Sequence, residues 1–225
     1  MGDYIVTRFC NELQMNLGNR SSLSSPTDWY LRLINQAYLQ LCTRDKIFGI
    51  RKKIYIPELE TSEVKTTTDG TAYISVPTTA YVVRGIWNTT DDAMLTWIPP
   101  EEYWKRGGRA DTDSEGTPTE YTRRGTYLYL YPTPDSSSLS LTVYFKKRPT
   151  ELSAADDKTV IDKAWDDIIV NLATINGFYR LQEPDIADAW KKRFIDDIEG
   201  VINSIYDEMV QANVNLHPHE AYISR

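Results

Sequence analysis

The sequence predicts an α+β protein: a four-helix bundle, with two N-terminal and two C-terminal helices, interrupted by an antiparallel β-sandwich or barrel-like module. Apolar residues recur every three or four positions near both ends of the chain, whereas the middle alternates with a period of two. Clusters of Gly, Pro, Asp and Ser separate the alternating runs, as turns separate strands. We therefore predict a discontinuous helical domain (1–50 and 150–212), a β-rich insertion (51–149) and an extended C-terminal tail (213–225).

Two helices are predicted before the β-rich insertion. The first covers residues 3–17, where every fourth side chain is apolar: Ile5, Phe9, Leu13 and Leu17. Gly18 provides a stop signal after it. Ser25 has the side chain of an N-cap, and Pro26 suits the first position of a second helix that extends to about Arg44.

Alternation and turn residues predict the strands of the insertion, at 54–56, 63–68, 72–76, 80–87, 94–98, 118–123, 126–131 and 139–145. Asp69-Gly70 predicts a tight hairpin between the second and third of them. Residues 99–105 predict one or two helical turns. Strand 126–131 places Tyr127, Tyr129 and Tyr131 on one face. Because aromatic side chains are enriched at protein interfaces, we expect an interaction surface there.

Helical periodicity returns after the insertion. Thr159-x-x-Asp162 is similar to a capping box and predicts a helix that begins near Asp157 or Thr159, and Pro184 opens a further helix. From Gln211 the periodicity stops, although the tail keeps several large side chains. We expect these to dock into a partner protein: Val214, Leu216, His217, Pro218, Tyr222 and Ile223.

Composition excludes several classes. No apolar run approaches the roughly 18 residues of a membrane span, and the N-terminus lacks the features of a signal peptide. Cys10 and Cys42 are expected to be reduced thiols in the core. The net charge is −7, and residues 151–225 contain 15 acidic and 7 basic side chains. Most DNA-binding surfaces have the opposite sign, but an acidic surface suits a channel that DNA crosses without sticking.

No catalytic or cofactor site is predicted. His217 and His219, the only two histidines, lie in the tail, so the folded part cannot pair Ser or Cys with His. With Glu220 they lack the converging ligands of a metal site, and Gly107-Gly108 lacks the spacing of a phosphate-binding loop. Adjacent carboxylates on a helix diverge, so we expect the acidic pairs on solvated faces or at helix starts: 91–92, 156–157, 166–167 and 196–197.

Three basic clusters leave an alternative open: Arg51-Lys52-Lys53, Arg123-Arg124 and Lys146-Lys147-Arg148. Such charges usually protect strand edges from aggregation. Together with the tyrosine-rich strand, they are also compatible with a β-sandwich module that binds nucleic acid or carbohydrate. A hydrolase is the third and least supported possibility, because no histidine lies in the folded part.

The stretch from Gly116 to Pro149 contains three linked patterns: Gly116-x-Pro118-x-x-Tyr121, then Gly125-x-x-Leu128-x-Leu130-x-Pro132-x-Pro134-Asp135, then Val143-x-x-x-x-Arg148-Pro149. These patterns resemble those of the head-to-tail adaptor proteins of tailed bacteriophages. The helical continuation, with Trp165, Gly177-Phe178-Tyr179 and Gln182-Glu183-Pro184, is similar to the same family. The resemblance covers residues 116–206 and extends to the N-terminal half only in layout.

The resemblance implies a structural virion protein of the neck, made in the host cytoplasm. It implies a dodecameric ring of identical subunits beneath the portal protein, with DNA passing through the lumen without sequence-specific binding. The tail would insert into the portal, and the β-module would face neighbouring subunits, the tail nozzle or tube, or tail fibres. No enzyme activity, cofactor or membrane is implied.

Overall fold

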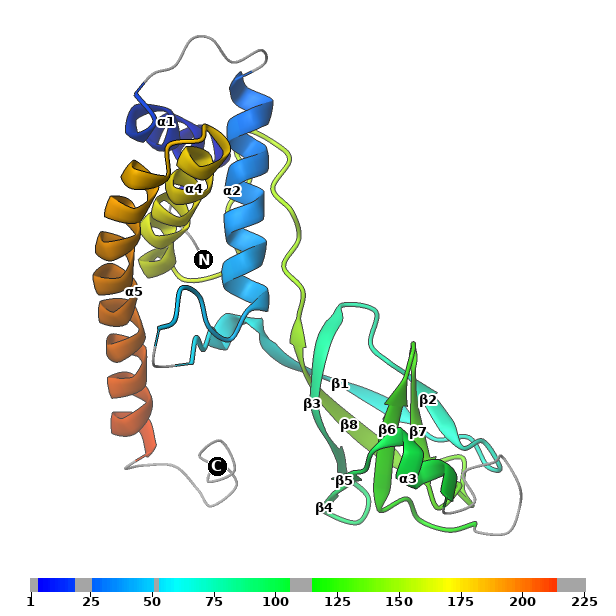
Figure 1. Ribbon diagram of the computed structural model, residues 1–225. Helices are drawn as coiled ribbons and strands as arrows, with labels where there is room; N and C mark the ends of the chain where they lie inside the picture. Colours follow the sequence, from blue (N-terminus) through cyan, green and yellow to red (C-terminus); the bar gives the residue numbers. More distant parts are fainter. Residues whose placement is uncertain (1–3, 19–25, 51–52, 106–114, 214–225) are drawn as a thin grey trace. The chain divides into compact units, whose positions relative to one another are not determined.

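The computed structural model describes residues 4–18, 26–50, 53–105 and 115–213. Within these ranges the chain is mixed α+β, with five α-helices and two four-stranded sheets (Figure 1). It divides into a helical unit, Met1–Glu58 with Pro149–Arg225, and a β unit, Leu59–Arg148.

The helical unit is organised around one central helix. Helix α4 (Asp166–Arg180) contacts α1 (Val6–Asn16), α2 (Pro26–Thr43) and α5 (Pro184–Asn213), and Figure 1 shows it between them. Residues 168–175 of α4 are all buried. A helix that is apolar nearly all round is stable only when other elements cover it, which explains why α4 takes the centre.

A glycine lets α4 approach its neighbours closely. A Cβ atom at Gly177 would lie 3.0 and 3.1 Å from the two terminal carbons of Leu17, and 3.4 Å from one of Leu33. Leu17 and Leu33 are fully buried, so they have little room to move away. Gly177 therefore sets the distance between α4 and the segment that follows α1.

Replacing Gly177 by alanine is expected to lower the free energy of unfolding by about 1 kcal/mol, because overpacking outweighs the gain in helix propensity. Gly200 in α5 is the matched control, since a Cβ atom there meets nothing within 4 Å. Gly200→Ala should raise stability by about 0.5–1 kcal/mol. Urea unfolding followed by circular dichroism measures both. Equal stabilisation by the two substitutions would show that Gly177 is not a packing residue.

Hydrogen bonds join the two chain segments of the helical unit. The backbone N–H of Val6 donates to the carbonyl of Asp157 at 3.0 Å. The Asn35 side chain donates to the carbonyl of Leu152 and accepts from its N–H, both at 2.8 Å. The segment that leads from the β unit into α4 thus helps to hold the N-terminal helices in place.

The predicted start of the third long helix, near Asp157 or Thr159, is wrong. Helix α4 begins at Asp166, after a 3₁₀ turn, η2 (Lys163–Trp165). Asp162 caps this turn by accepting from the N–H of Ala164 at 2.8 Å. The Thr159 hydroxyl instead donates to the Asp166 carboxylate at 3.3 Å. The polar residues that imitated a capping box therefore stabilise an irregular entry segment. The other predicted start is confirmed, because α5 begins at Pro184.

The β unit contains eight strands in the described residues. Their bounds are β1 Glu60–Thr66, β2 Tyr73–Ser75, β3 Ala80–Asn88, β4 Ala93–Met94, β5 Thr96–Trp97, β6 Glu120–Arg124, β7 Tyr127–Tyr131 and β8 Ser140–Lys147. They form two sheets, in the orders β1-β8-β3-β4 and β2-β7-β6-β5. A short helix, α3 (Pro100–Lys105), and a 3₁₀ turn, η1 (Pro57–Leu59), complete the elements.

Both sheets contribute to one core. The cluster contains side chains from β2, β3, β6, β7 and β8 and from the link between β4 and β5: Ile74, Ile86, Leu95, Tyr121, Leu128, Leu130, Leu141, Val143 and Phe145. In β7 and β8 these buried positions alternate with outward ones, as the period of two predicts. The two sheets therefore face each other through these side chains.

Four strand predictions need correction. Residues 54–56 are not a strand, and Ile54 and Ile56 are buried in the helical unit. The hairpin across Asp69-Gly70 is wrong, since β1 pairs with β8 and β2 pairs with β7. The predicted strand 94–98 is split between β4 and β5, which belong to different sheets. The β5–β6 pair is parallel, so the module is not wholly antiparallel.

The physical reason for the false hairpin lies in the turn's hydrogen bonds. The Gly70 N–H donates to the carbonyl of Pro134 at 2.9 Å, and the Thr67 N–H donates to that of Leu139 at 3.1 Å. The turn is therefore held by the β7–β8 connection instead of by its own two strands, and the chain crosses there from one sheet to the other.

Candidate functional site

Six aromatic side chains gather on the outer side of the β2-β7-β6-β5 sheet, on β2, β7 and the adjacent α3. We call them the aromatic face: Tyr73, Tyr103, Trp104, Tyr127, Tyr129 and Tyr131. Strand β7 carries three of them because its alternation sends Leu128 and Leu130 into the core. The predicted arrangement of the three tyrosines along β7 is what the structure contains, whereas their role as an interface remains a prediction.

The rings contact one another mainly edge to face. Tyr73 is paired across the sheet with Tyr129, at 5.8 Å between ring centroids, and lies 4.9 Å from Tyr127 with an interplanar angle of 70°. Trp104 lies 6.0 Å from Tyr129 at 59°. Tilted pairs of this kind stabilise by about 0.5–1.5 kcal/mol beyond their area, so the side chains form one cohesive cluster.

Helix α3 holds one end of this cluster. Tyr103 is 1% exposed, and its hydroxyl donates to the carbonyl of Leu130 at 3.3 Å. Burial raises the pKa of Tyr103 above that of a free tyrosine, so this hydroxyl stays protonated as a donor. Its ring centroid lies 6.4 Å from that of Tyr131 and 5.9 Å from that of Tyr129. The helix thus covers part of β7 and leaves the rest of the face open.

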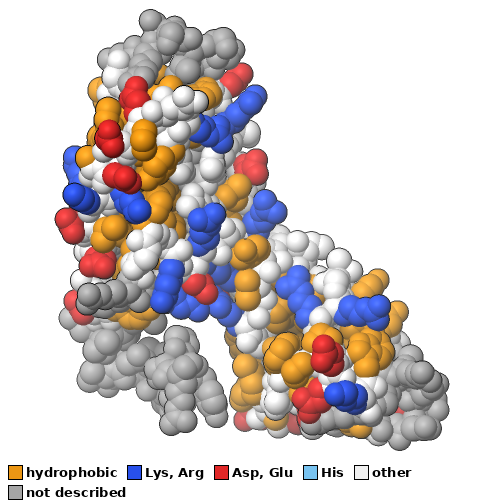
Figure 2. All heavy atoms as spheres, viewed as in Figure 1, with side chains coloured by type: hydrophobic (Ala, Val, Ile, Leu, Met, Phe, Trp, Pro, Cys, Tyr) orange, Lys and Arg blue, Asp and Glu red, His pale blue; other side chains and the backbone are white. Residues whose placement is uncertain are grey.

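The open part of the aromatic face contains three exposed side chains. Tyr73, Tyr127 and Trp104 are 45%, 42% and 39% exposed, and the Arg124 guanidinium lies 5.4 Å from the Trp104 ring centroid. On the visible side of the β unit, Figure 2 shows hydrophobic side chains next to charged ones. Monomeric proteins rarely leave contiguous apolar surface of this kind uncovered. The arrangement therefore suits binding of another macromolecule and provides no reactive group.

Sequence reasoning missed three members of the aromatic face, which are Tyr73, Tyr103 and Trp104, and also the neighbouring Arg124. In β2 the buried Ile74 lies between two exposed residues, Tyr73 and Ser75. The alternation of polar and apolar character in this strand could have predicted that Tyr73 faces outward. Trp104 belongs to the aromatic face only because α3 packs beside β7, and no local sequence pattern predicts where α3 packs. Arg124 belongs to a basic cluster that was expected to protect a strand edge, and its guanidinium lies over the ring of Trp104.

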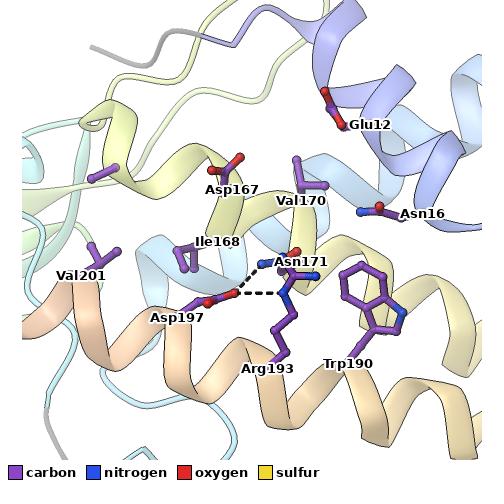
Figure 3. Close-up of a pocket in the computed structure, with 11 residues that line it drawn as sticks. Glu12, Asn16, Asp167, Ile168, Val170, Asn171, Trp190, Arg193, Asp197 and Val201 are labelled. Carbon is purple, nitrogen blue, oxygen red and sulfur yellow. Dashed lines mark hydrogen bonds and ion pairs between the residues drawn. The ribbon is translucent and has the colours of Figure 1, made fainter.

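The helical unit also has a concave surface. A groove of about 440 Å³ is lined by residues of α1, α4 and α5 (Figure 3). The Asp197 carboxylate accepts from the Asn171 side chain at 3.1 Å and lies 3.7 Å from Arg193 Nε. Asp167 accepts from the Tyr4 hydroxyl at 2.8 Å. Asp197 thus joins α5 to α4, and Asp167 joins α4 to the segment before α1. No group of metal-ligating side chains occurs in the residues that the structure describes.

The other predicted groups have structural roles or lie outside the described residues. Cys10 and Cys42 are buried thiols outside any disulfide, as predicted, and burial raises the pKa of Cys10 to about 11. Asp166 and Asp167 lie at the start of α4, one of the two places expected for the acidic pairs, but Asp166 is only 1% exposed and accepts from the N–H of Tyr4 at 2.9 Å. The tail residues lie outside the described ranges, as do both histidines, Gly107-Gly108 and Arg51-Lys52.

The comparison with protein families decides the identity. A family model described as SU10 adaptor protein matches residues 5–216. The chain belongs to the SU10 adaptor protein family. This is a family of phage head-to-tail adaptors, so the resemblance stated from residues 116–149 is confirmed. The match also includes the N-terminal half, where the resemblance was one of layout only.

Membership makes this adaptor a bacteriophage structural protein, and places it among neck components of the virion. No curated protein matches the chain. Among the described residues, no helix of the adaptor combines the length and apolar character needed to cross a membrane.

Proposed function

We propose that this adaptor joins the capsid to the tail as a dodecameric ring beneath the portal protein and lets the genome pass through its lumen. The family match over residues 5–216 is the observation that carries this proposal. In this proposal the helical unit is a four-helix bundle domain and the β unit is a β-sandwich domain inserted into it. The tail predicted at 213–225 is then an extended segment that docks into the portal with residues 214–225, since Asn213 still belongs to α5.

The aromatic face supports an assembly role. Its rings are tilted against one another at 52–89°, whereas a platform for stacked bases or sugars requires ring faces that are free. This geometry favours a protein partner over the nucleic acid or carbohydrate of the alternative hypothesis. In the proposed neck the partner is a neighbouring subunit, a tail nozzle or tube protein, or a tail fibre.

Charge supports passage of DNA. The net charge of −7 arises from the C-terminal part, where residues 151–225 contain 15 acidic and 7 basic side chains. Sequence-independent DNA binding depends on Lys and Arg at the phosphates. A subunit with this surplus of carboxylates does not retain the DNA that crosses the ring.

The tail provides the direct test. Deleting residues 214–225 is expected to weaken binding to purified portal rings by at least about a hundredfold. If docking buries only two of the large apolar side chains of the tail, such as Leu216 and Ile223, their loss removes about 3–6 kcal/mol of binding free energy. Surface plasmon resonance on immobilised portal rings measures the affinity. Asn215→Ser is the control, because it keeps the apolar residues of the tail. Unchanged affinity of the truncated protein would contradict docking through the tail.

A further inference from the structure

The β1-β8-β3-β4 sheet has an unusual outer side. Its inner positions on β8 are the core residues Leu141, Val143 and Phe145. We call the exposed set on its other side the β8 face: Val64, Val82, Met94 and Tyr144, which are 61%, 37%, 53% and 44% exposed. The solvated side of a sheet is normally polar, whereas here four exposed apolar side chains lie among polar ones such as Ser62 and Thr142. This mixture is like that of an interface between proteins.

Strand register places these side chains next to one another. Val64 is paired with Thr142, Thr142 with Trp87, and Trp87 with Met94, so one row crosses all four strands. Tyr144 lies in the next row, opposite Gly85. A Cβ atom at Gly85 would overlap the terminal methyl of Met94. The β8 face therefore consists of apolar side chains on neighbouring strands, with Met94 lying across Gly85, Thr142 within its row, and Val82 further along β3, opposite Lys146.

The β8 face and the aromatic face lie on opposite sides of the β unit, because the two sheets share one core between them. They also differ chemically: one is mainly aliphatic and thioether, the other aromatic. Two different surfaces on opposite sides of one subunit are what a heterologous contact requires, in which each copy presents one surface to the copy before it and the other to the copy after it.

We propose that the β8 face of one subunit packs against the aromatic face of the next, so that β units form the subunit contact of the ring. The inference rests on the ring in the proposed function. A second copy is the one occupant that covers both faces at once, and closing the ring leaves neither exposed. Thioether and aliphatic groups also pack favourably against aromatic rings.

Electrostatics allow this contact. On the β8 side, Arg84 donates to Glu60 at 2.9 Å, and on the aromatic side Arg124 lies over Trp104. Burying a charge is costly when it has no partner. Packing the two faces together therefore buries Arg84 with its counter-charge, and the Arg124 guanidinium keeps its favourable contact with the Trp104 ring.

Site-directed cross-linking of adaptor rings assembled on purified portal tests the contact. One variant carries Met94→Cys, another carries Tyr127→Cys, and a third carries both. A short bismaleimide reagent should convert the double variant into a ladder up to full rings on denaturing gels. Mixed single variants should stop at dimers, and each single variant alone should remain monomeric. Ile186→Cys combined with Tyr127→Cys is the control, because Ile186 is also exposed, at 44% against 53% for Met94, but belongs to the helical unit.

The outcomes separate this contact from the proposed function. Dimers from one single variant alone would mean that a face contacts its own copy, which overturns the heterologous arrangement. Rings that keep their size in native mass spectrometry, but whose double variant is not cross-linked above the control, would overturn the contact and leave the ring intact. Adaptor that binds portal without forming any ring would overturn both.

Discussion

Replacing Phe194 by alanine is expected to lower the free energy of unfolding of the helical unit by about 3–5 kcal/mol, the range for deleting a buried aromatic side chain. Phe194 is fully buried on α5, and its ring meets that of Phe48 edge to face at 5.6 Å. The substitution therefore leaves a cavity under the helix that precedes the tail. Such a loss is a large fraction of the stability of a typical domain.

Urea unfolding followed in the helical band of circular dichroism measures this effect. Ile186→Ala on the same helix is the matched control, because that side chain is 44% exposed, and it should change stability by no more than about 0.5 kcal/mol. If the two variants unfold at the same urea concentration, α5 is not held through Phe194. The Phe194 variant should also dock more weakly on portal, since the tail continues from α5.

Replacing Tyr103 by alanine is expected to cost the β unit about 3–5 kcal/mol. Tyr103 is 1% exposed, contacts Tyr129 and Tyr131, and bonds to the carbonyl of Leu130. Without it α3 loses its anchor on β7. The aromatic face then loses the side on which Trp104 is positioned, so ring assembly on portal should fail under conditions that support the unaltered protein.

Tyr103→Phe separates packing from hydrogen bonding. It keeps the ring and removes the hydroxyl, so the expected cost is only about 0.5–1.5 kcal/mol, and rings should still form. Hydrogen exchange followed by mass spectrometry reports on β6 and β7 without interference from the helical unit. Equal exchange rates in the alanine and phenylalanine variants would show that the ring of Tyr103 does not anchor α3.

Local periodicity was sufficient for the long helices and for the best-defined strands. The recurrence of Ile5, Phe9 and Leu13 predicts α1 because a helix buries every third or fourth residue whatever covers it. Alternation in residues 126–131 likewise predicts which side chains of β7 enter the core. The turn and core motifs between Gly116 and Pro149 were enough to indicate the family, since turn residues are dictated by backbone conformation over a few positions.

Strand partners were not predictable in the same way. Asp69-Gly70 has the residues of a hairpin turn, yet its hydrogen bonds go to Pro134 and the strands on either side enter different sheets. Thr159-x-x-Asp162 imitates a helix start, but Thr159 bonds to the buried Asp166. In both cases partners distant in sequence decide how polar groups are satisfied, and a local pattern contains no information about them.

The amino-acid pattern alone was enough to predict the α+β class, the order of helical and β-rich segments, the inner and outer sides of β7, and the adaptor family. These features follow from periods and turn residues that act over a few positions. Three features became clear only from the folded chain: α4 is the central helix, β1 and β2 belong to different sheets, and α3 brings Trp104 and Tyr103 to the β7 tyrosines. Those features depend on contacts between segments that are distant in the sequence, because the packing of the whole core determines which segments lie next to one another.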